Sequence, residues 1–308
     1  MQSQIFSRFC IFIFIAAAFQ LRAETVDTNS IKAHLKKIIN TKEPRNFRNL
    51  SALNEVAAYI YNDFEKYADT VYYQPYIING IAYKNVVCVF GRANVSTIVV
   101  GAHYDVCGNQ DGADDNATGV VGLLELAKLL KGKKLEKRIE IVAYTLEEPP
   151  YFKTNYMGSY IHAKSLNDRK TNVYGMICLE MIGYFDDSKK SQDYPIGALS
   201  ILYGNKGDYI TLVNKFAKGK FSRKFTVVFK KTSLIKTKKF TAPKGLPGID
   251  FSDHLNYWQF GYSAVMITDT AFYRNKNYHQ NTDTIATLDL FKMSQVIETV
   301  FHALIGVR

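Results

Sequence analysis

The chain has 308 residues, of which 47% are hydrophobic and 22% are charged, and this composition excludes an intrinsically disordered protein. Its net charge is +11, with lysines concentrated in residues 131–137 and 230–244. No nucleic-acid-binding motif accompanies these lysines, so we interpret them as a solvated basic surface and expect no nucleic-acid partner.

Residues 1–23 are predicted to be a secretory signal peptide. An apolar run at residues 10–21 is too short to span a bilayer comfortably, and the small residue Ala23 stands at the expected cleavage position. We therefore expect cleavage after Ala23, a catalytic domain at residues 24–308, and a protein that is secreted or periplasmic. An uncleaved anchor is the alternative, and no membrane span is expected once the signal has been removed.

The cysteines do not predict a disulfide framework, because only three of the four remain after residue 23. Cys88 and Cys178 stand inside apolar runs and are interpreted as small buried side chains. Cys107 lies close to His103 and Asp105 in the sequence and is a candidate soft zinc ligand. A hard carboxylate set is already available there, so we do not include Cys107 among the predicted ligands.

The first third of the chain predicts two helices and a hairpin. The helices are expected at residues 31–40 and 49–67, the second with its apolar residues along one stripe. Asn79-Gly80 is a strong hairpin signal that joins predicted strands at residues 71–77 and 85–90.

Strands then alternate with helices, which predicts one α/β domain around a mixed, mainly parallel sheet with helices on both faces. The predicted buried strands cover residues 97–100, 138–146, 173–181 and 263–267, and the predicted helices cover residues 120–130, 158–166 and 288–305. Residues 199–203 and 226–229 are predicted strands, and residues 208–218 a helix. An irregular basic excursion near the mouth of the site is expected at residues 230–247.

The stretch from Ser96 to Leu130 contains the first candidate site. Its apolar β-branched run, residues 97–100, delivers His103 and Asp105 just beyond its end. A polar loop follows, and it carries three acids: Asp111, Asp114 and Asp115. Ligands of open α/β sheets gather beyond the carboxyl ends of the strands, so these side chains favour a divalent metal site over a solvated acidic loop.

Two further strand ends carry isolated acids. Glu147 and Glu148 follow the strand at residues 138–146, and Glu180 stands near the end of the next apolar strand. A glutamate pair at a strand end is usually solvated, but a lone carboxylate in an apolar strand needs a partner or a metal to justify its burial. Together with His279, in a late polar turn, these residues predict one composite site.

Five segments together resemble the co-catalytic dizinc aminopeptidase family, whose members include secreted bacterial leucyl-type aminopeptidases, glutamate carboxypeptidase and glutaminyl cyclase. The segments are GAHYD at 101–105, GADDNATG at 112–119, the Glu147-Glu148 pair, LEMIG at 179–183 and YHQNTDT at 278–284. The resemblance covers about residue 85 to the C-terminus. It implies a zinc peptidase domain that binds two Zn²⁺ ions.

The resemblance also implies a role for each matching residue. His103 and Glu180 would hold one zinc, Glu148 and His279 would hold the other, and Asp115 would bridge the two.

Further roles follow from the same resemblance. Asp105 would orient the His103 imidazole, Glu147 would be the general base, and the peptide bond from Asp115 to Asn116 would be cis.

Four residues are candidates for contact with substrate. Asp253 and His254 match a Ser-Asp-His segment of the family that either approaches the substrate or supports its loop. Tyr151 and Phe152, where the chain departs from the better-known aminopeptidases, either line an apolar side-chain pocket or pack the loop.

The implied activity is an aminopeptidase that acts on peptides with a free N-terminus, and we expect the protein to be a monomer. Glu180 stands where the family's aminopeptidases usually have Asp, and this longer carboxylate still binds zinc. A glutaminyl cyclase with one zinc is an alternative, although its motifs tend to have Asp-Ser where this chain has Asp115-Asn116. The resemblance is also compatible with a dipeptidase, a carboxypeptidase or a non-catalytic binding domain.

Overall fold

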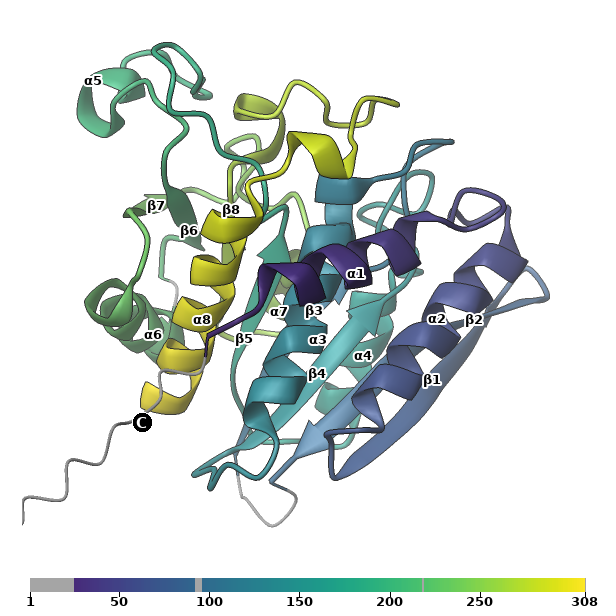
Figure 1. The fold of residues 1–308 in the computed structure, drawn as a ribbon. Coiled ribbons are helices and arrows are strands. Elements are labelled where there is room, and N and C mark those ends of the chain that lie inside the picture. The colour runs from purple at the N-terminus through teal and green to yellow at the C-terminus, as the bar shows by residue number, and fades with distance from the viewer. Residues whose placement is uncertain (1–24, 92–95, 218, 308) are drawn as a thin grey trace, which may run out of the picture.

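One mixed sheet organises the computed structural model, which describes residues 25–91, 96–217 and 219–307 (Figure 1). The predicted signal peptide lies outside the described residues. Within them the sheet has eight strands in the order β1-β2-β4-β3-β5-β8-β6-β7. The strands are β1 (Thr70–Ile78), β2 (Ile81–Phe90), β3 (Thr97–His103), β4 (Arg138–Tyr144), β5 (Val173–Glu180), β6 (Ile210–Lys215), β7 (Thr237–Ala242) and β8 (Ala264–Thr268).

The four central strands, β4, β3, β5 and β8, run parallel, and antiparallel pairs flank them on both sides. β1, β2 and β4 form an antiparallel ribbon at one side, and β6 reverses direction next to β8 at the other. This arrangement confirms the predicted α/β class. Because β3, β4 and β5 are parallel, their carboxyl ends meet at one edge, which is where such sheets bind ligands.

Helices cover both faces of the sheet. One face packs against α1 (Thr28–Ile39), α2 (Leu50–Phe64), α3 (Gly119–Leu130), α6 (Gly219–Thr232) and α8 (Leu290–Gly306). The other face packs against α4 (Gly158–Asp168) and α7 (His254–Gln259). The short helix α5 (Leu199–Tyr203) has no buried residue and projects away from the sheet (Figure 1). Three further helical segments lie at Ala113–Thr118, Ala271–Tyr273 and Ile285–Thr287.

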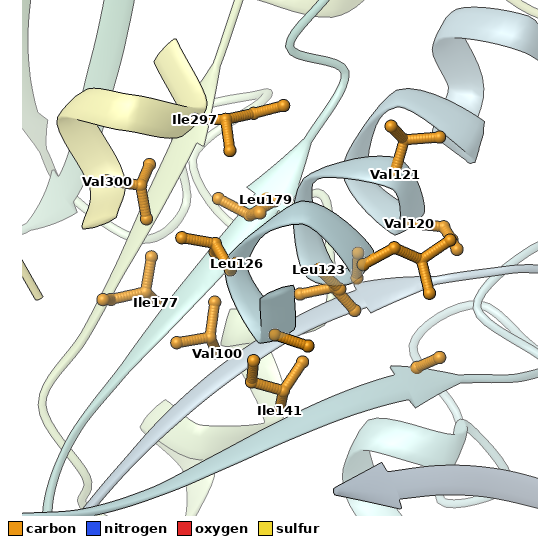
Figure 2. Packing of buried hydrophobic residues seen from close by; sticks show 14 of the residues in the cluster. Val100, Val120, Val121, Leu123, Leu126, Ile141, Ile177, Leu179, Ile297 and Val300 are labelled. Carbon is orange, nitrogen blue, oxygen red and sulfur yellow. The ribbon is translucent and has the colours of Figure 1, made fainter. Parts of the chain in front are cut away.

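The larger core is built around α3, whose sequence is apolar on nearly all sides. An all-round apolar helix must be covered on all sides. Accordingly, α3 packs on strands β3, β4 and β5 with one side and on α1, α2 and α8 with the other. Figure 2 shows these side chains gathered, with Val100, Ile141 and Ile177 from the strands and Ile297 and Val300 from α8.

The structure confirms the predicted hairpin and the central strands. Asn79 and Gly80 both have positive φ, 50° and 78°, as the tight turn between antiparallel strands requires. Within the described residues, no helix combines the length and apolar character that a bilayer crossing requires.

The predictions between residues 199 and 229 were wrong. Residues 199–203 are helix α5, residues 210–215 are strand β6 where a helix was predicted, and residues 226–229 lie within helix α6. In β6, the side chains of Ile210 and Leu212 pack into one core and that of Val213 packs into the other. Side chains therefore alternate between the two faces of the sheet every second residue, as in a strand.

In α6 the deciding residues are three phenylalanines spaced four apart: Phe221, Phe225 and Phe229. All three are buried, and this helical stripe prevails over the local β-branched run, residues 226–228. Residues 230–247 also differ from the irregular excursion predicted, because they contain β7 as an edge strand paired with β6.

The segment before α2 holds the loop that follows β3. Arg45 is 1% exposed and donates from Nε to the carbonyl of Tyr104 at 2.9 Å and from one terminal nitrogen to that of Gly112 at 2.6 Å. Its other terminal nitrogen donates to the carbonyl of Asp111. Asn46 adds a hydrogen bond to the carbonyl of Gly108 at 2.5 Å. The N-terminal segment therefore fixes the loop that carries the predicted metal ligands.

We expect Arg45→Met to lower the free energy of unfolding by about 3 kcal/mol, because it leaves buried carbonyls without a donor. Urea denaturation would measure the change. The matched control is Arg48→Met, which removes an exposed arginine three residues away and should change stability by less than about 0.5 kcal/mol. Equal effects of the two substitutions would contradict the assigned role of Arg45.

Candidate metal centre

The predicted ligands converge at the carboxyl edge of the parallel strands. Nε2 of His103, the last residue of β3, lies 3.4 Å from Oδ1 of Asp115 and 3.5 Å from Oε2 of Glu180, the last residue of β5. On the other side, Oδ2 of Asp115 lies 3.1 Å from Nε2 of His279, which is 3.3 Å from Oε2 of Glu148. Asp115 thus faces two ligand pairs with separate oxygens.

Several polar atoms at this place are buried and lack a hydrogen bond. Oδ2 of Asp115 and Nε2 of His279 are 3.1 Å apart but do not meet hydrogen-bond geometry, and Oε1 of Glu148 has no hydrogen-bond partner among the described residues. His103, Asp115 and Glu180 offer ligand atoms that all lie within 4.8 Å of one another. Buried imidazole and carboxylate groups that face one another without full hydrogen bonding are suited to a divalent cation, and mixed nitrogen and oxygen donors suit zinc. The residues present therefore fit zinc.

Asp105 connects β3 with the glutamate pair after β4. Its Oδ1 accepts from the backbone N–H of Glu147 and its Oδ2 from that of Glu148, both at 3.1 Å. Oδ1 also lies 3.5 Å from Nδ1 of His103. One carboxylate therefore orients three members of the site, and the chain turns sharply to allow this, with φ of 62° at Leu146.

The backbone around Asp115 is held by two side chains. The carboxylate of Asp283 accepts from the N–H groups of Asp114 and Asp115, at 2.9 and 3.1 Å. Oδ1 of Asn116 accepts from the N–H of Met181 at 3.0 Å, which ties the loop to the end of β5. The peptide bond between Asp115 and Asn116 is cis, as the resemblance implied.

The crowding of acids shifts the pKa values of the site. Burial raises the pKa of Glu147 well above its usual value, although His103 opposes the shift. Burial and the charge of Asp115 raise the pKa of Glu148 to about 7. Burial would lower the pKa of His279, but its contacts with Asp115 and Glu148 outweigh burial and raise that pKa to about 10. A bound cation would take the place of these protons, so metal binding and proton release are coupled.

A cavity of about 780 Å³, including space open to solvent, borders the site at Glu180. Its walls are largely aromatic, and Tyr278 is one of them. The Tyr278 ring stacks on the His279 imidazole with a centroid distance of 3.8 Å and an interplanar angle of 18°. The cavity and the metal ligands therefore share a wall.

Comparison with known proteins agrees with this geometry. A family model described as Peptidase family M28 matches residues 85–304. The chain belongs to this family.

Three relatives illustrate the range of similar proteins. The chain is 42% identical over 278 residues to the uncharacterized protein YfbL of Escherichia coli (strain K12), covering 88% of this chain and 85% of YfbL. It is 25% identical over 231 residues to a probable leucine aminopeptidase of Arthroderma otae, covering 70% of this chain and 55% of that protein. The solved glutaminyl cyclase of Tannerella forsythia shares the fold, with a TM-score of 0.66, 20% identity, and coverage of 92% of this chain and 100% of that chain.

The candidate substrate residues of this M28 chain do not line the cavity. Asp253 and His254 are both 0% exposed, so they would act on a substrate only through neighbouring groups. Nε2 of His254 lies 2.7 Å from the carbonyl of Ile249, within the same loop region.

The two aromatic candidates pack mainly with other rings. The ring of Tyr151 packs edge-on against Phe47, Tyr83 and Tyr156. Phe152 contacts Phe251, which does line the cavity, with centroids 5.8 Å apart. Tyr151 thus packs among rings beside the loop after β4, Phe152 contacts a residue of the cavity wall, and contact of either with substrate stays a prediction.

Sequence reasoning missed the residues that hold the ligands in place. Asp283, in the YHQNTDT segment, and Asn116 received no supporting role, although both contact the backbone around Asp115. Ser252 donates a hydrogen bond to Oε2 of Glu180 at 2.5 Å. Cys107, which was not included among the predicted ligands, has Sγ within 4.8 Å of ligand atoms of Glu148 and His279. Asp283 and Asn116 lie within segments that match the family, and this position was the sequence signal that could have identified them.

We expect Asp105→Asn to weaken zinc binding about 10- to 100-fold, because an amide offers one acceptor oxygen where the carboxylate offers two. One of the two glutamate N–H groups then loses its acceptor. Zinc affinity measured with a competing chelator would report the change. Asp111→Asn alters an exposed acid of the same loop and should leave zinc affinity unchanged, and an equal loss in both variants would contradict the role given to Asp105.

Proposed function

We propose that this chain is a zinc-dependent aminopeptidase that hydrolyses the first peptide bond of substrates with a free N-terminal amine. The observation that carries the proposal is Asp115, whose two oxygens face His103 on one side and His279 on the other. His103 and Glu180 would hold one zinc, Glu148 and His279 the second, and Asp115 would belong to both. Membership of the M28 family and the similarity to a probable leucine aminopeptidase support this assignment.

Zinc, when bound, supplies Lewis acidity that acidifies water and polarises the carbonyl of the scissile bond. The chain's own contribution to proton transfer is Glu147. This carboxyl is 6% exposed, and Oε2 lies 3.9 Å from Nε2 of His103. It accepts the proton of the attacking water and returns it to the departing amine.

The N-terminal residue of a substrate is expected to enter the cavity beside Glu180. A free ammonium group would lie beside Glu180, a carboxylate of the site that also lines the cavity, and this placement favours cleavage next to the N-terminus. The cavity would then receive the side chain of that first residue, because Glu180 is part of its lining.

Glutaminyl cyclisation is the second candidate, since a solved glutaminyl cyclase has the same fold. The two candidates differ in the number of metal ions that they need. The two ligand pairs that face Asp115 favour two zinc ions and therefore favour hydrolysis. One bound zinc with cyclisation of N-terminal glutamine would select the cyclase instead.

We further propose that the protein is exported, on the basis of residues 1–23. N-terminal sequencing of the protein from its native source should begin at Glu24. A protein that still begins at Met1 would contradict cleavage.

We expect Glu147→Gln to lower kcat about 10²- to 10⁴-fold on aminoacyl-anilides while zinc content stays at two per chain. The glutamine preserves shape but cannot accept the proton. Glu65→Gln, an exposed change at the end of α2, is the matched control and should retain full activity. Thermal unfolding of both variants would verify that they are folded.

The same assay separates the candidate activities. Cleavage confined to anilides with a free amine, lost on N-acetylation, supports the aminopeptidase. Two zinc ions without anilide cleavage would contradict it and point to a dipeptidase or carboxypeptidase. The absence of bound zinc in the purified protein and after zinc addition would refute the metal centre.

A further inference from the structure

The floor of the cavity is a row of four side chains that crosses the sheet. Glu180 of β5 pairs with Thr268 of β8, Thr268 pairs with Thr211 of β6, and Thr211 pairs with Lys238 of β7. All four residues line the cavity. Because neighbouring strands lie about 4.8 Å apart, the Cα atoms of Glu180 and Lys238 are separated by roughly 14 Å. The row has an acid of the metal centre at one end and a lysine at the other.

The walls above this floor combine apolar rings with hydroxyl groups. Five tyrosines contribute to the lining: Tyr194, Tyr203, Tyr209, Tyr273 and Tyr278. A second row, from Met266 through Val213 to Phe240, gives the cavity an apolar section beside the polar one. The hydroxyl groups of Tyr194, Tyr203, Tyr209 and Tyr273 are hydrogen-bonded within the protein. The lysine at the end of the row is therefore the group that a pocket for a purely aliphatic side chain would not require.

Lys238 is the basic residue of this lining, and its ammonium lacks a carboxylate partner. Nζ donates to the carbonyl of Tyr203 and lies 3.3 Å from the centroid of the Tyr209 ring. Among the described residues, no carboxylate forms an ion pair with Nζ within 4.0 Å. Burial lowers the pKa of Lys238 to about 8, as expected for a partly desolvated ammonium.

The nearby acids are engaged by other lysines. Asp208 lies 2.7 Å from Nζ of Lys236, and Asp193, which also lines the cavity, lies 2.6 Å from Nζ of Lys276. The guanidinium of Arg274 adds a second positive charge, 4.7 Å from the centroid of the Tyr209 ring. The end of the cavity away from the metal centre is therefore electropositive.

We propose that Lys238 is a specificity-determining residue that binds the side-chain carboxylate of an acidic N-terminal residue. This inference rests on the proposed aminopeptidase function and names its substrate class: peptides that begin with Glu or Asp. An apolar side chain filling the cavity would desolvate the ammonium further without giving it a partner, which is unfavourable. A carboxylate gives it a charge-assisted hydrogen bond, while the Tyr209 ring and the apolar row contact the methylene groups.

The test compares substrates that differ only in charge. Anilides of Glu and Gln have nearly the same shape, so the ratio of their kcat/KM values isolates the carboxylate. The wild-type protein should favour Glu, and Lys238→Met should lower the Glu-to-Gln ratio about 10- to 100-fold while cleavage of the Gln anilide stays within a factor of about three. Lys238→Arg should retain the preference. Lys239→Met, an exposed change in the same strand, should match the wild type.

Calorimetric binding of free L-glutamate and L-glutamine provides a readout independent of turnover. We expect glutamate to bind more tightly than glutamine to the wild-type protein, and this difference should disappear in Lys238→Met. A preference for Leu or Phe anilides over Glu, or a Glu-to-Gln ratio unchanged in Lys238→Met, would overturn the proposal. If no anilide is cleaved, the aminopeptidase function fails, and the calorimetric comparison still decides whether Lys238 recognises a carboxylate.

Discussion

Mutual repulsion between buried carboxylates is the constraint to which this structure responds. Glu147, Glu148, Glu180 and Asp115 are each at most 6% exposed and meet at one edge of the sheet. Carboxylates so close together cannot all remain charged without compensation, and two imidazoles alone do not provide it. A cationic ligand would resolve the conflict. The fold around the site can be understood as a frame that keeps these groups together before such a ligand arrives.

That frame depends on acids that do not face the proposed ligand. Asp105 and Asp283 use both carboxylate oxygens to accept from backbone N–H groups, at distances of 2.9–3.1 Å. Each fixes two consecutive residues, so the side chains of those residues have little freedom to move apart. Arg45 performs the complementary task for carbonyl groups of the loop after β3. Arg45 lies before residue 85, where the family match begins, so part of the support comes from outside the matched region.

The sequence predicted the parallel strands and the convergence of the candidate ligands at their ends, because both depend on short-range patterns. A continuous apolar run ending in His103 or Glu180 shows both a buried strand and its polar terminus. The region from residue 199 to residue 229 was not predictable in the same way. Ile210, Leu212 and Val213 fit either period over so short a segment, and only packing against two different cores decides for a strand. The row of cavity side chains from Glu180 to Lys238 could not be predicted from the sequence either, because it crosses four strands whose order depends on the tertiary fold.

The stacking of Tyr278 on His279 would link the proposed substrate cavity to the candidate metal centre. Tyr278 belongs to the cavity wall, and its neighbour His279 is a proposed ligand 25% exposed to solvent. A side chain bound in the cavity would limit the movement of this ring and, through it, of the imidazole. Evolution of a new specificity by changes at this wall would therefore also alter metal retention. Changes around Lys238, at the far end of the floor, leave the ligands untouched, so this end is where the pocket can diversify independently.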